Sequence, residues 1–387
     1  MEWAWQADLD VRRTRRWEWT VVCYDRRAAP GTYFMSGVRS KVARALCKTA
    51  GPSLAPRAVV ARAFSRVHTE LVGAAGAEPA DLYYGGTTGG IVPAAQAAAL
   101  RGAPYALDLE DFYSSEVDGP TSELIHRLAE LLERAILPGA SFLTAGSAPI
   151  ADAYAEKYGV RPIPINNTFR LPAFAPDLTP SPGEGLRLYW FSQTVGPNRG
   201  LEEAVRAMGL AGVPGELHLR GRPSGDYLAR LCGHVASTAK NLRIVHHEPA
   251  PPDKMVEVSS GYDVGLALEQ PHIPNRDLCL TNKAFTYMLA GLAVAMTDTR
   301  GQRPLALDMG EGAALYQPGD VYALAERFRF WARDKSRLAA AKAAAWEAAR
   351  RRWHWEHPLE KGALLRLVES AVVHSDSRQP ENTCVAS

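Results

Sequence analysis

Two basic side chains occupy positions in the sequence where a strand is expected to give way to a helix. Lys283 follows Asn282 at the start of a predicted helix over 282–290, and Arg199 lies in the loop GPNRG ahead of another predicted helix. Free N–H groups and the dipole at a helix N-terminus favour an anion, and a guanidinium carries a planar fork of donors that fits a phosphate. If the two cations converge, they predict a site for a diphosphate, whose growing negative charge they would stabilise while a bond to it breaks.

Each of these features also has a simpler interpretation. A single lysine in a first helical turn is usually a solvated residue, and one glycine-rich loop between a strand and a helix is usually only a turn. Gly196 and Gly200 bracket Arg199, however, and a glycine lets the backbone approach a ligand closely. Because two matching cationic loops occur in one stretch of alternating strands and helices, we favour the diphosphate interpretation, with Gly196 close to the ligand.

The elements that must position these loops follow a regular alternation. Short apolar segments predicted as strands alternate with helical patterns along residues 80–158 and again along 186–316. This alternation is typical of a parallel sheet covered by helices on both faces. Between the two stretches, residues 173–185 are crowded with proline and glycine and are predicted to be a linker. The sequence therefore predicts an α/β protein with two doubly wound, Rossmann-like domains that face each other across a cleft.

The predicted boundaries divide the whole chain. The domains are expected at 1–172 and 186–352, on either side of the linker. A helix at 353–373 is expected to close the chain by packing back towards the N-terminal domain. The polar residues 374–387 are expected to form a disordered tail.

Composition limits the classes of protein that the chain can belong to. Its 387 residues carry a formal net charge of +2, with 47% hydrophobic and 22% charged residues. This balance is that of a soluble globular protein and gives no reason to expect a nucleic acid or an anionic membrane as partner. The basic run Arg12, Arg13, Arg15 and Arg16 is interpreted as solvated surface. No apolar run is long enough to span a membrane and the start of the chain has no secretory pattern, so a cytoplasmic location is expected.

Cysteine usage and amino-acid bias add two weaker indications. The five cysteines are scattered, so they offer no disulfide or zinc framework and fit reduced thiols. Abundant alanine, arginine, glycine and proline suggest a bacterial source. The sequence gives no indication of the oligomeric state.

The order and spacing of these segments resemble a known family. NKAFTYMLAGLAVAMTD, at 282–298, resembles the donor-site helix NKxFEYMAAGxPVVATD of GT-B glycosyltransferases of the retaining type, often called group 1 or family 4. FSQTVGPNRGLEEAVRAM resembles the family's loop of glycine and basic residues with the helix that follows it. ADLYYGGTTGG and the segment up to residue 116 resemble an N-terminal stretch of the family, and Trp353 resembles the tryptophan that opens its closing helix. The resemblance covers about residues 60–370.

The resemblance implies a role for each cation. A nucleoside-diphosphate sugar would be the co-substrate and would bind the C-terminal domain, while a small-molecule or glycan acceptor would bind mainly the N-terminal one. Arg199 and Lys283 would hold the donor diphosphate, Gly196 would let the backbone approach it, and Asn282 would brace the lysine loop. Such a site needs no metal and no further cofactor, because the departing phosphate oxygen itself deprotonates the acceptor.

Two donor-site positions depart from the family pattern. Members usually carry two glutamates separated by seven residues, the second of which binds the nucleotide ribose. Thr286 stands at the second position and Leu278 at the first. A threonine hydroxyl can still form a hydrogen bond to a ribose hydroxyl, although a weaker one than an ionised carboxylate would form. Glu269, at the end of a predicted strand, is the candidate for a carboxylate that contacts the sugar.

The acceptor side departs further. Glu110 replaces a histidine of the family's motif and is the third candidate catalytic residue, and Thr87 and Thr88 lie where the family has His-Asp. With Asp111 and Glu116, Glu110 places negative charge near the acceptor, which would suit an amino or otherwise cationic substrate. A solvated acidic turn explains the same residues equally well.

The start of the chain departs as well. The predicted strand WTVVCYD at 19–25 resembles the family's second strand, so residues 1–18 appear in place of the first. The resulting hypothesis is a metal-independent retaining glycosyltransferase of hexosyltransferase type, acting in specialised metabolism. Two alternatives stay open: a catalytically silent homologue that binds a sugar nucleotide or a partner protein, and a pseudo-glycosyltransferase that couples a non-sugar cyclitol.

Overall fold

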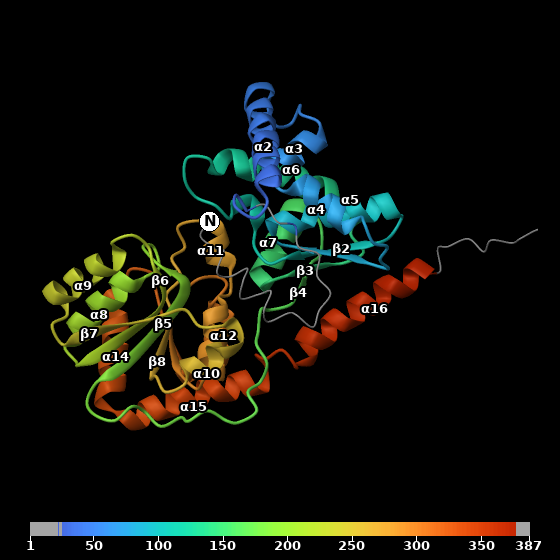
Figure 1. Ribbon diagram of the computed structural model, residues 1–387. Coiled ribbons are helices and arrows are strands. Elements are labelled where there is room, and N and C mark those ends of the chain that lie inside the picture. The colour runs from blue at the N-terminus through green and yellow to red at the C-terminus, as the bar shows by residue number, and fades with distance from the viewer. Residues whose placement is uncertain (1–21, 23–24, 377–387) are drawn as a thin grey trace, which may run out of the picture. The chain divides into compact units, whose positions relative to one another are not determined.

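The computed structural model describes residue 22 and residues 25–376 and divides them into two compact units (Figure 1). One unit contains the described residues up to Ile165 together with those from Ala363 onward, and the other contains Asn166–Gly362. Nearly all of the strand predicted at 19–25, the residues 1–18 ahead of it and the tail from 377 lie outside the described residues.

The first unit is built on a parallel sheet of four strands in the order β1-β2-β3-β4. These strands are β1 (Tyr83–Gly86), β2 (Tyr105–Leu109), β3 (Leu143–Ala145) and β4 (Ile163–Pro164). Helices α5 (Thr87–Arg101), α6 (Ser122–Ile136) and α7 (Ala148–Tyr158) connect them, which confirms the predicted alternation. The remaining helices of the unit are α2 (Pro30–Ala50), α3 (Arg57–Phe64), α4 (His68–Ala75) and α16 (Ala363–Asp376).

The second unit contains a parallel sheet of six strands in the order β10-β9-β8-β5-β6-β7. The strands are β5 (Leu186–Val195), β6 (Gly215–Pro223), β7 (Leu242–His247), β8 (Val264–Ala267), β9 (Ala293–Thr297) and β10 (Ala313–Tyr316). The helices are α8 (Leu201–Ala211), α9 (Tyr227–Thr238), α10 (Met255–Ser259), α11 (Pro274–Leu278), α12 (Asn282–Leu289), α13 (Arg303–Met309), α14 (Val321–Arg333) and α15 (Lys335–Arg351). Two Rossmann-like α/β units are thus confirmed.

The central strand β5 shows why this unit buries both faces of its sheet. Leu188 and Trp190 belong to one core cluster, with α8, α9 and α14, whereas Tyr189 belongs to a second cluster with α12 and α13. Side chains alternate between the faces of a strand, so the run LRLYWF, apolar except for Arg187, supplies both clusters. Each fully buried large side chain contributes roughly 1.5–3 kcal/mol. Figure 1 shows the two groups of helices on opposite sides of the sheet.

The strand order of the second unit reverses between β5 and β8. The chain runs from β5 outward to β6 and β7, then returns to place β8 and β9 on the other side of β5. In open parallel sheets, ligands bind outside the carboxyl ends of the strands at such a reversal, because the two connecting loops diverge there. Both cationic loops predicted from the sequence lie at this edge, after β5 and at the start of α12.

The segment that joins the two sheets packs against the second unit. Phe169 and Leu171 contact its core, and a side chain on Gly291, whose φ is +74°, would come within 2.7 Å of Pro176. The second unit therefore begins at Asn166, ahead of the boundary expected at residue 172.

A buried carboxylate holds the start of that segment. The backbone N–H of Asn166 donates to Oε2 of Glu360 at 2.7 Å, and its side-chain amide donates to Oε1 at 2.9 Å. Arg352 forms an ion pair with Glu360 at 2.7 Å. Glu360 lies in a π-helical turn, Pro358–Gly362, ahead of α16. The chain crosses between the units twice, after Ile165 and after Gly362. Hydrogen bonds between Asn166 and Glu360 join the two crossing segments within the second unit.

Candidate functional site

The loop after β5 rests on the end of β8 because of one glycine. Gly200 has a φ of +73°, and a Cβ atom there would lie 2.5 Å from the Cβ of Leu268. Asn198 also has a positive φ, of 59°. A left-handed backbone and a contact this close both require glycine at 200. The loop therefore holds Arg199 beside the residues that follow β8.

Gly196 lies earlier in the same loop, directly after β5. It is buried, and a Cβ atom on it would meet Ser224 at 3.5 Å, an ordinary contact. The steric requirement for glycine in this loop thus falls on Gly200. An approach of Gly196 to a ligand stays a prediction.

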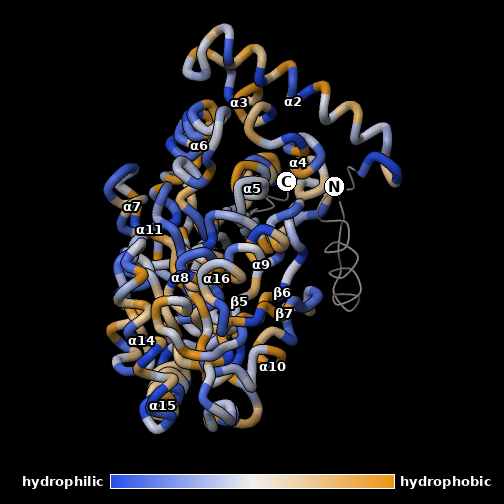
Figure 2. The backbone as a smooth tube through the Cα atoms, turned by 90° about the vertical axis from the view of Figure 1, so that its left-hand side faces the viewer, coloured by the Kyte–Doolittle hydropathy of each residue, from blue (hydrophilic) through white to orange (hydrophobic). Residues whose placement is uncertain are grey.

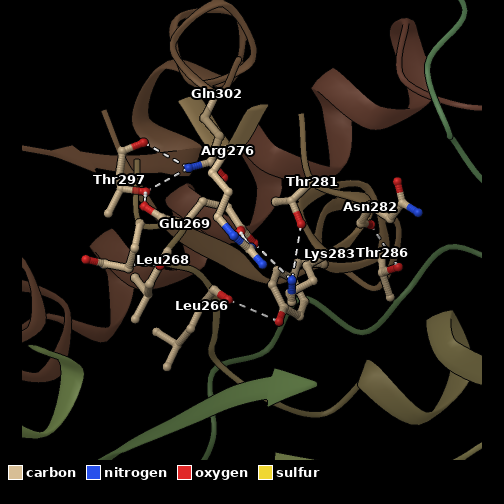
Figure 3. A network of polar contacts seen from close by, with 12 residues as sticks. Leu266, Leu268, Glu269, Arg276, Thr281, Asn282, Lys283, Thr286, Thr297 and Gln302 are labelled. Carbon is tan, nitrogen blue, oxygen red and sulfur yellow. Dashed lines mark hydrogen bonds and ion pairs between the residues drawn. The ribbon is translucent and has the colours of Figure 1, made fainter. Parts of the chain in front are cut away.

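Glu269 is the centre of the polar cluster at this edge (Figure 3). One carboxylate oxygen is 3.0 Å from Nζ of Lys283, and the other is 3.0 Å from Nη1 of Arg276. Burial raises the pKa of Glu269, but the charges of Lys283, Arg276 and Arg199 together outweigh it and bring the pKa to about 2. The carboxylate is therefore ionised at every physiological pH.

Arg199 belongs to the same cluster through its charge. Burial lowers the pKa of its guanidinium, the charge of Arg276 lowers it further, and Glu269 acts in the opposite direction. Both predicted cations thus lie within electrostatic reach of one carboxylate. Three positive groups against one negative group leave an excess of two positive charges (3 − 1 = 2) at the carboxyl edge of the sheet. A dianionic group such as a diphosphate would match that excess.

The start of α12 positions the lysine. Thr281 is the N-cap residue, and its Oγ1 lies 3.3 Å from Nζ of Lys283. Asn282 is exposed, and its side chain points away from the Glu269 cluster in Figure 3. Thr281, rather than the Asn282 side chain, therefore supports the lysine.

Thr286 is turned back on its own helix. The residue is fully buried, and its hydroxyl donates to the carbonyl oxygen of Asn282 at 3.2 Å. Sequence comparison with the family suggested that this hydroxyl contacts a nucleotide ribose. Its one donor is used within the helix, as is common for a helical threonine, and a contact between Thr286 and a ribose stays a prediction.

The backbone of Glu269 is fixed from the neighbouring strand. Thr297, the last residue of β9, donates its hydroxyl to the carbonyl of Glu269 at 2.7 Å. The side-chain amide of Gln302 in turn donates to the Thr297 carbonyl at 2.9 Å, and all of these atoms are buried. The backbone that carries the central carboxylate is thus fixed by Thr297, which Gln302 holds in turn.

Arg276 and Gln302 were not found by sequence reasoning. Arg276 lies in α11, within the connection between β8 and α12, and it is a basic residue in a strand-to-helix connection, as Arg199 is. The same criterion applied to that connection would have found it. Nothing local in the sequence distinguishes Gln302, whose role depends on its burial.

The corresponding edge of the first unit carries threonines and carboxylates. Thr87, with a φ of 60°, and Thr88 open α5 directly after β1. On the next strand, Asp108 accepts a hydrogen bond from the hydroxyl of Thr144 at 2.6 Å. Burial raises the pKa of Asp108, and the Thr144 hydrogen bond acts against this.

Glu110 and Asp111 follow β2 at the same edge, together with Glu116. Burial raises the pKa of Glu116, and the charges of Asp111, Glu110 and Glu133 raise it further, to about 7. A side chain on Gly146 would come within 2.6 Å of the carbonyl oxygen of Glu110, so the glycine lets this turn lie against the next connection. Glu110 and Asp111 are therefore brought together with Glu116 as an acidic edge.

The described residues contain neither a cluster of metal ligands nor a membrane-spanning helix. In residue 22 and residues 25–376, no group of three or more histidine, cysteine, aspartate or glutamate side chains could hold a metal ion. Over the same residues, no helix combines the length and the apolar character needed to cross a bilayer.

Part of the sequence matches a family model, and the fold resembles that of solved structures. Residues 11–166 match the model of the glycosyl transferase 4-like domain family. The chain is similar to HepE of Anabaena in complex with UDP and glucose, with 19% identity, a TM-score of 0.59 and coverage of 78% of this chain and 81% of that one. It is also similar to sucrose-phosphate synthase from Thermosynechococcus elongatus, with 17% identity, a TM-score of 0.61 and coverage of 79% and 78%. No curated protein matches the chain in sequence.

A more distant likeness is to TarM of S. aureus, with 10% identity, a TM-score of 0.56 and coverage of 72% of this chain and 53% of that one. Together these likenesses show that the chain has the GT-B fold. The family match covers residues 11–166, in the N-terminal part of the chain.

Proposed function

We propose that this protein transfers a sugar from a UDP-sugar to a small-molecule or glycan acceptor, with retention of configuration at the anomeric carbon. The observation that carries the proposal is the cluster of Arg199, Arg276 and Lys283 around Glu269 at the strand-order reversal of the six-stranded sheet. UDP is favoured as the nucleotide because HepE was solved with UDP and with UDP-glucose, and TarM with UDP.

The cluster supplies what the leaving group needs. As the bond between the anomeric carbon and the diphosphate breaks, its electron pair passes to the phosphate oxygen, where Arg199 and Lys283 stabilise the charge. The acceptor oxygen forms its bond to the same face of the anomeric carbon and loses its proton to the departing phosphate oxygen. The products are UDP and the glycoside. Fixed cations take the part that a metal plays in other transferases, so we propose that the reaction needs none.

Glu269 has a separate part in this scheme. Before the donor binds, its two oxygens hold Arg276 and Lys283, which would otherwise repel each other and Arg199. When a diphosphate enters, the cations can share their donors between the phosphates and Glu269. The site is thus organised in advance, which reduces the cost of ordering flexible side chains on binding.

The acidic edge of the first unit gives a hypothesis for the acceptor. Burial is the main cause of the raised pKa of Glu116, and the negative charges of Asp111 and Glu110 add to it. A cationic group bound there would offset these charges, so an acceptor that carries an amino group fits this edge. Thr87 and Thr88 remain candidates for hydrogen bonds to its hydroxyl groups.

One observation favours a second candidate, a catalytically silent homologue. Thr286 stands where the family has a ribose-binding glutamate, and its hydroxyl is satisfied within α12. A chain that binds the nucleotide with fewer contacts and does not turn over would have this feature.

Nucleotide binding and donor turnover test both candidates in the full chain. We expect UDP to raise the melting temperature more than GDP, dTDP or ADP does, since a ligand at 100 times its Kd stabilises by about 2.7 kcal/mol. We also expect slow release of UDP from at least one UDP-sugar. R199A and K283A should lose both signals, while K254A, which removes an exposed lysine paired with Glu257, should keep them. UDP binding without release from any donor, whichever acceptor is added, would favour the silent form, and binding of no nucleotide would overturn the proposal.

A further inference from the structure

Helix α2 of the first unit leaves a row of large apolar side chains uncovered. This row, the α2 stripe, consists of Phe34, Met35, Val38, Val42 and Leu46. Their spacing of three or four residues places them on one side of a helix. Phe34 is 71% exposed and Val42 54%, values at which the side chains face solvent. Contiguous apolar surface of this kind marks an interaction site in most proteins.

The opposite side of α2 is the one that packs on the protein. The residues buried there are small or polar: Ser36, Ser40, Ala43 and Cys47. Arg44 fixes the orientation, because its Nε donates to the carbonyl of Ala63, the residue before the end of α3, at 2.8 Å. The α2 stripe therefore cannot turn inward without breaking this packing. Figure 2 shows α2 at the periphery of its unit with hydrophobic segments along it.

The charges of α2 all have one sign. The helix contains four basic residues and no acidic one: Arg39, Lys41, Arg44 and Lys48. Lys41 and Lys48 are exposed and, at 100° per residue, project along one flank of the α2 stripe. Leu54, 83% exposed, lies in the connection between α2 and α3.

The sequence ahead of α2 is rich in tryptophan and arginine. The residues ahead of it include four tryptophans and six arginines: Trp3, Trp5, Trp17, Trp19, Arg12, Arg13, Arg15, Arg16, Arg26 and Arg27. Tryptophan is the residue most typical of the boundary between lipid and water, and clustered basic residues are attracted to anionic lipid. Five acidic residues in the same stretch leave residues 1–29 with a net charge of only +1 (6 − 5 = 1), so the basic excess lies in α2 itself, with +4.

We propose that the α2 stripe binds the surface of an anionic lipid bilayer, with α2 lying in the plane of the interface. The apolar side chains would enter the boundary between headgroups and acyl chains, and Lys41 and Lys48 would contact lipid phosphates. A second copy of the chain is a poorer occupant, since antiparallel pairing of two stripes would bring lysines of like charge together. The inference does not depend on the proposed transferase activity.

Vesicle sedimentation of the full chain tests the proposal. We expect the protein to sediment with vesicles of 70% phosphatidylcholine and 30% phosphatidylglycerol, less so as salt is raised, and not with pure phosphatidylcholine. The variant V38S/V42S should lower the partition coefficient about tenfold or more through lost apolar burial. K41Q/K48Q should lower it by about the same factor on anionic vesicles alone. L307S, which alters an isolated leucine 73% exposed in α13, is the matched control and should bind as the wild type does.

Circular dichroism confirms that each variant is folded, and light scattering reports the oligomeric state. Absence of binding to anionic vesicles, or binding that V38S/V42S leaves unchanged, overturns the proposal. A dimer that V38S/V42S converts to monomer also overturns it, because the α2 stripe would then be covered by a second copy.

Discussion

The carboxyl edges of the two parallel sheets carry opposite charge. In the second unit, Arg199, Arg276 and Lys283 surround a single carboxylate, whereas in the first unit Glu110, Asp111 and Glu116 gather after β2. Both edges are built by the same alternation of strand and helix, so the backbone alone does not distinguish them. The residues placed in the connections decide which ligand each edge can bind: an anionic group in one and a cationic group in the other.

Two glutamates express the difference most directly. Burial raises the pKa of both Glu269 and Glu116. The three surrounding cations then bring the pKa of Glu269 down to about 2, while neighbouring carboxylates add to the effect on Glu116 and bring its pKa to about 7. Residue type and burial therefore predict little about ionisation until the neighbouring charges are known. Four substitutions test this comparison.

The largest effect is expected from removing the lysine of the cationic edge. K283A should lower kcat by on the order of 10²–10³, the scale of losing one donor that stabilises transition-state charge. The measurement is UDP release from the preferred donor under saturating substrate. K254A removes an exposed lysine of the same unit and should retain full activity. If K283A keeps activity within a few-fold of the wild type, Lys283 does not belong to the site.

Neutralising the carboxylate at the centre of the same edge should mainly affect stability. E269Q leaves three cations without their shared anion, and breaking a buried pair in this way costs on the order of 3 kcal/mol. Because the pKa of Glu269 is depressed, its stabilising contribution is present above the unfolded value of 4.5 and is lost as pH falls towards 2. The difference in the free energy of unfolding between wild type and E269Q, measured by urea denaturation, should therefore become smaller as the pH is lowered.

The matched control for that measurement is E257Q, which breaks an exposed ion pair with Lys254. Exposed pairs of this kind contribute about 0–1 kcal/mol. An E269Q variant as stable as E257Q at pH 7 would mean that Glu269 does not hold the cluster together.

The residue that sequence reasoning missed gives the next prediction. R276A removes the one cation of the cluster that sequence analysis did not identify, and we expect it to weaken UDP binding about tenfold, the scale of one charge-assisted hydrogen bond. Isothermal titration calorimetry measures the change. R300A alters a more exposed arginine, paired with Asp277 nearby, and serves as the control. Equal affinities in R276A and R300A would restrict the diphosphate contact to Arg199 and Lys283.

The fold was largely predictable from the sequence, because each strand and helix has a recognisable local pattern of apolar residues. Apolar runs such as LRLYWF and VGLA can only be buried strands when helical patterns separate them, so the two parallel sheets were predictable. The start of the second unit was harder to predict, because the proline-rich segment ahead of its first strand has the composition of a linker. Phe169 and Leu171 nevertheless pack on the core of that unit. Composition does not reveal which surface a proline-rich segment lies against.

Site residues were predictable where their place in a strand-to-helix loop is enough to position them. Arg199 and Lys283 follow from their strand-to-helix connections, and the close contact at Gly200 brings the first of them to the end of β8. Thr286 was not predictable, since its hydroxyl could turn towards a ligand or towards its own helix, and burial decides between them. Glu269 was identified only as a carboxylate near the sugar. Its contacts with Lys283 and Arg276 depend on the tertiary structure.

The smallest effect is expected at the acidic edge, where pH is the variable. Glu116 has a pKa raised to about 7, so its contribution favours the folded state below the unfolded value of 4.5 and is lost as pH rises through 7. The wild type should therefore lose more stability between pH 5 and pH 8 than E116Q, which cannot ionise at this position. Urea denaturation at the two pH values measures this, with E123Q, an exposed glutamate of α6, as the control. Identical pH dependence in all three proteins would mean that the pKa of Glu116 is not raised in the folded protein, and the contrast between the two edges would then rest on the cationic side alone.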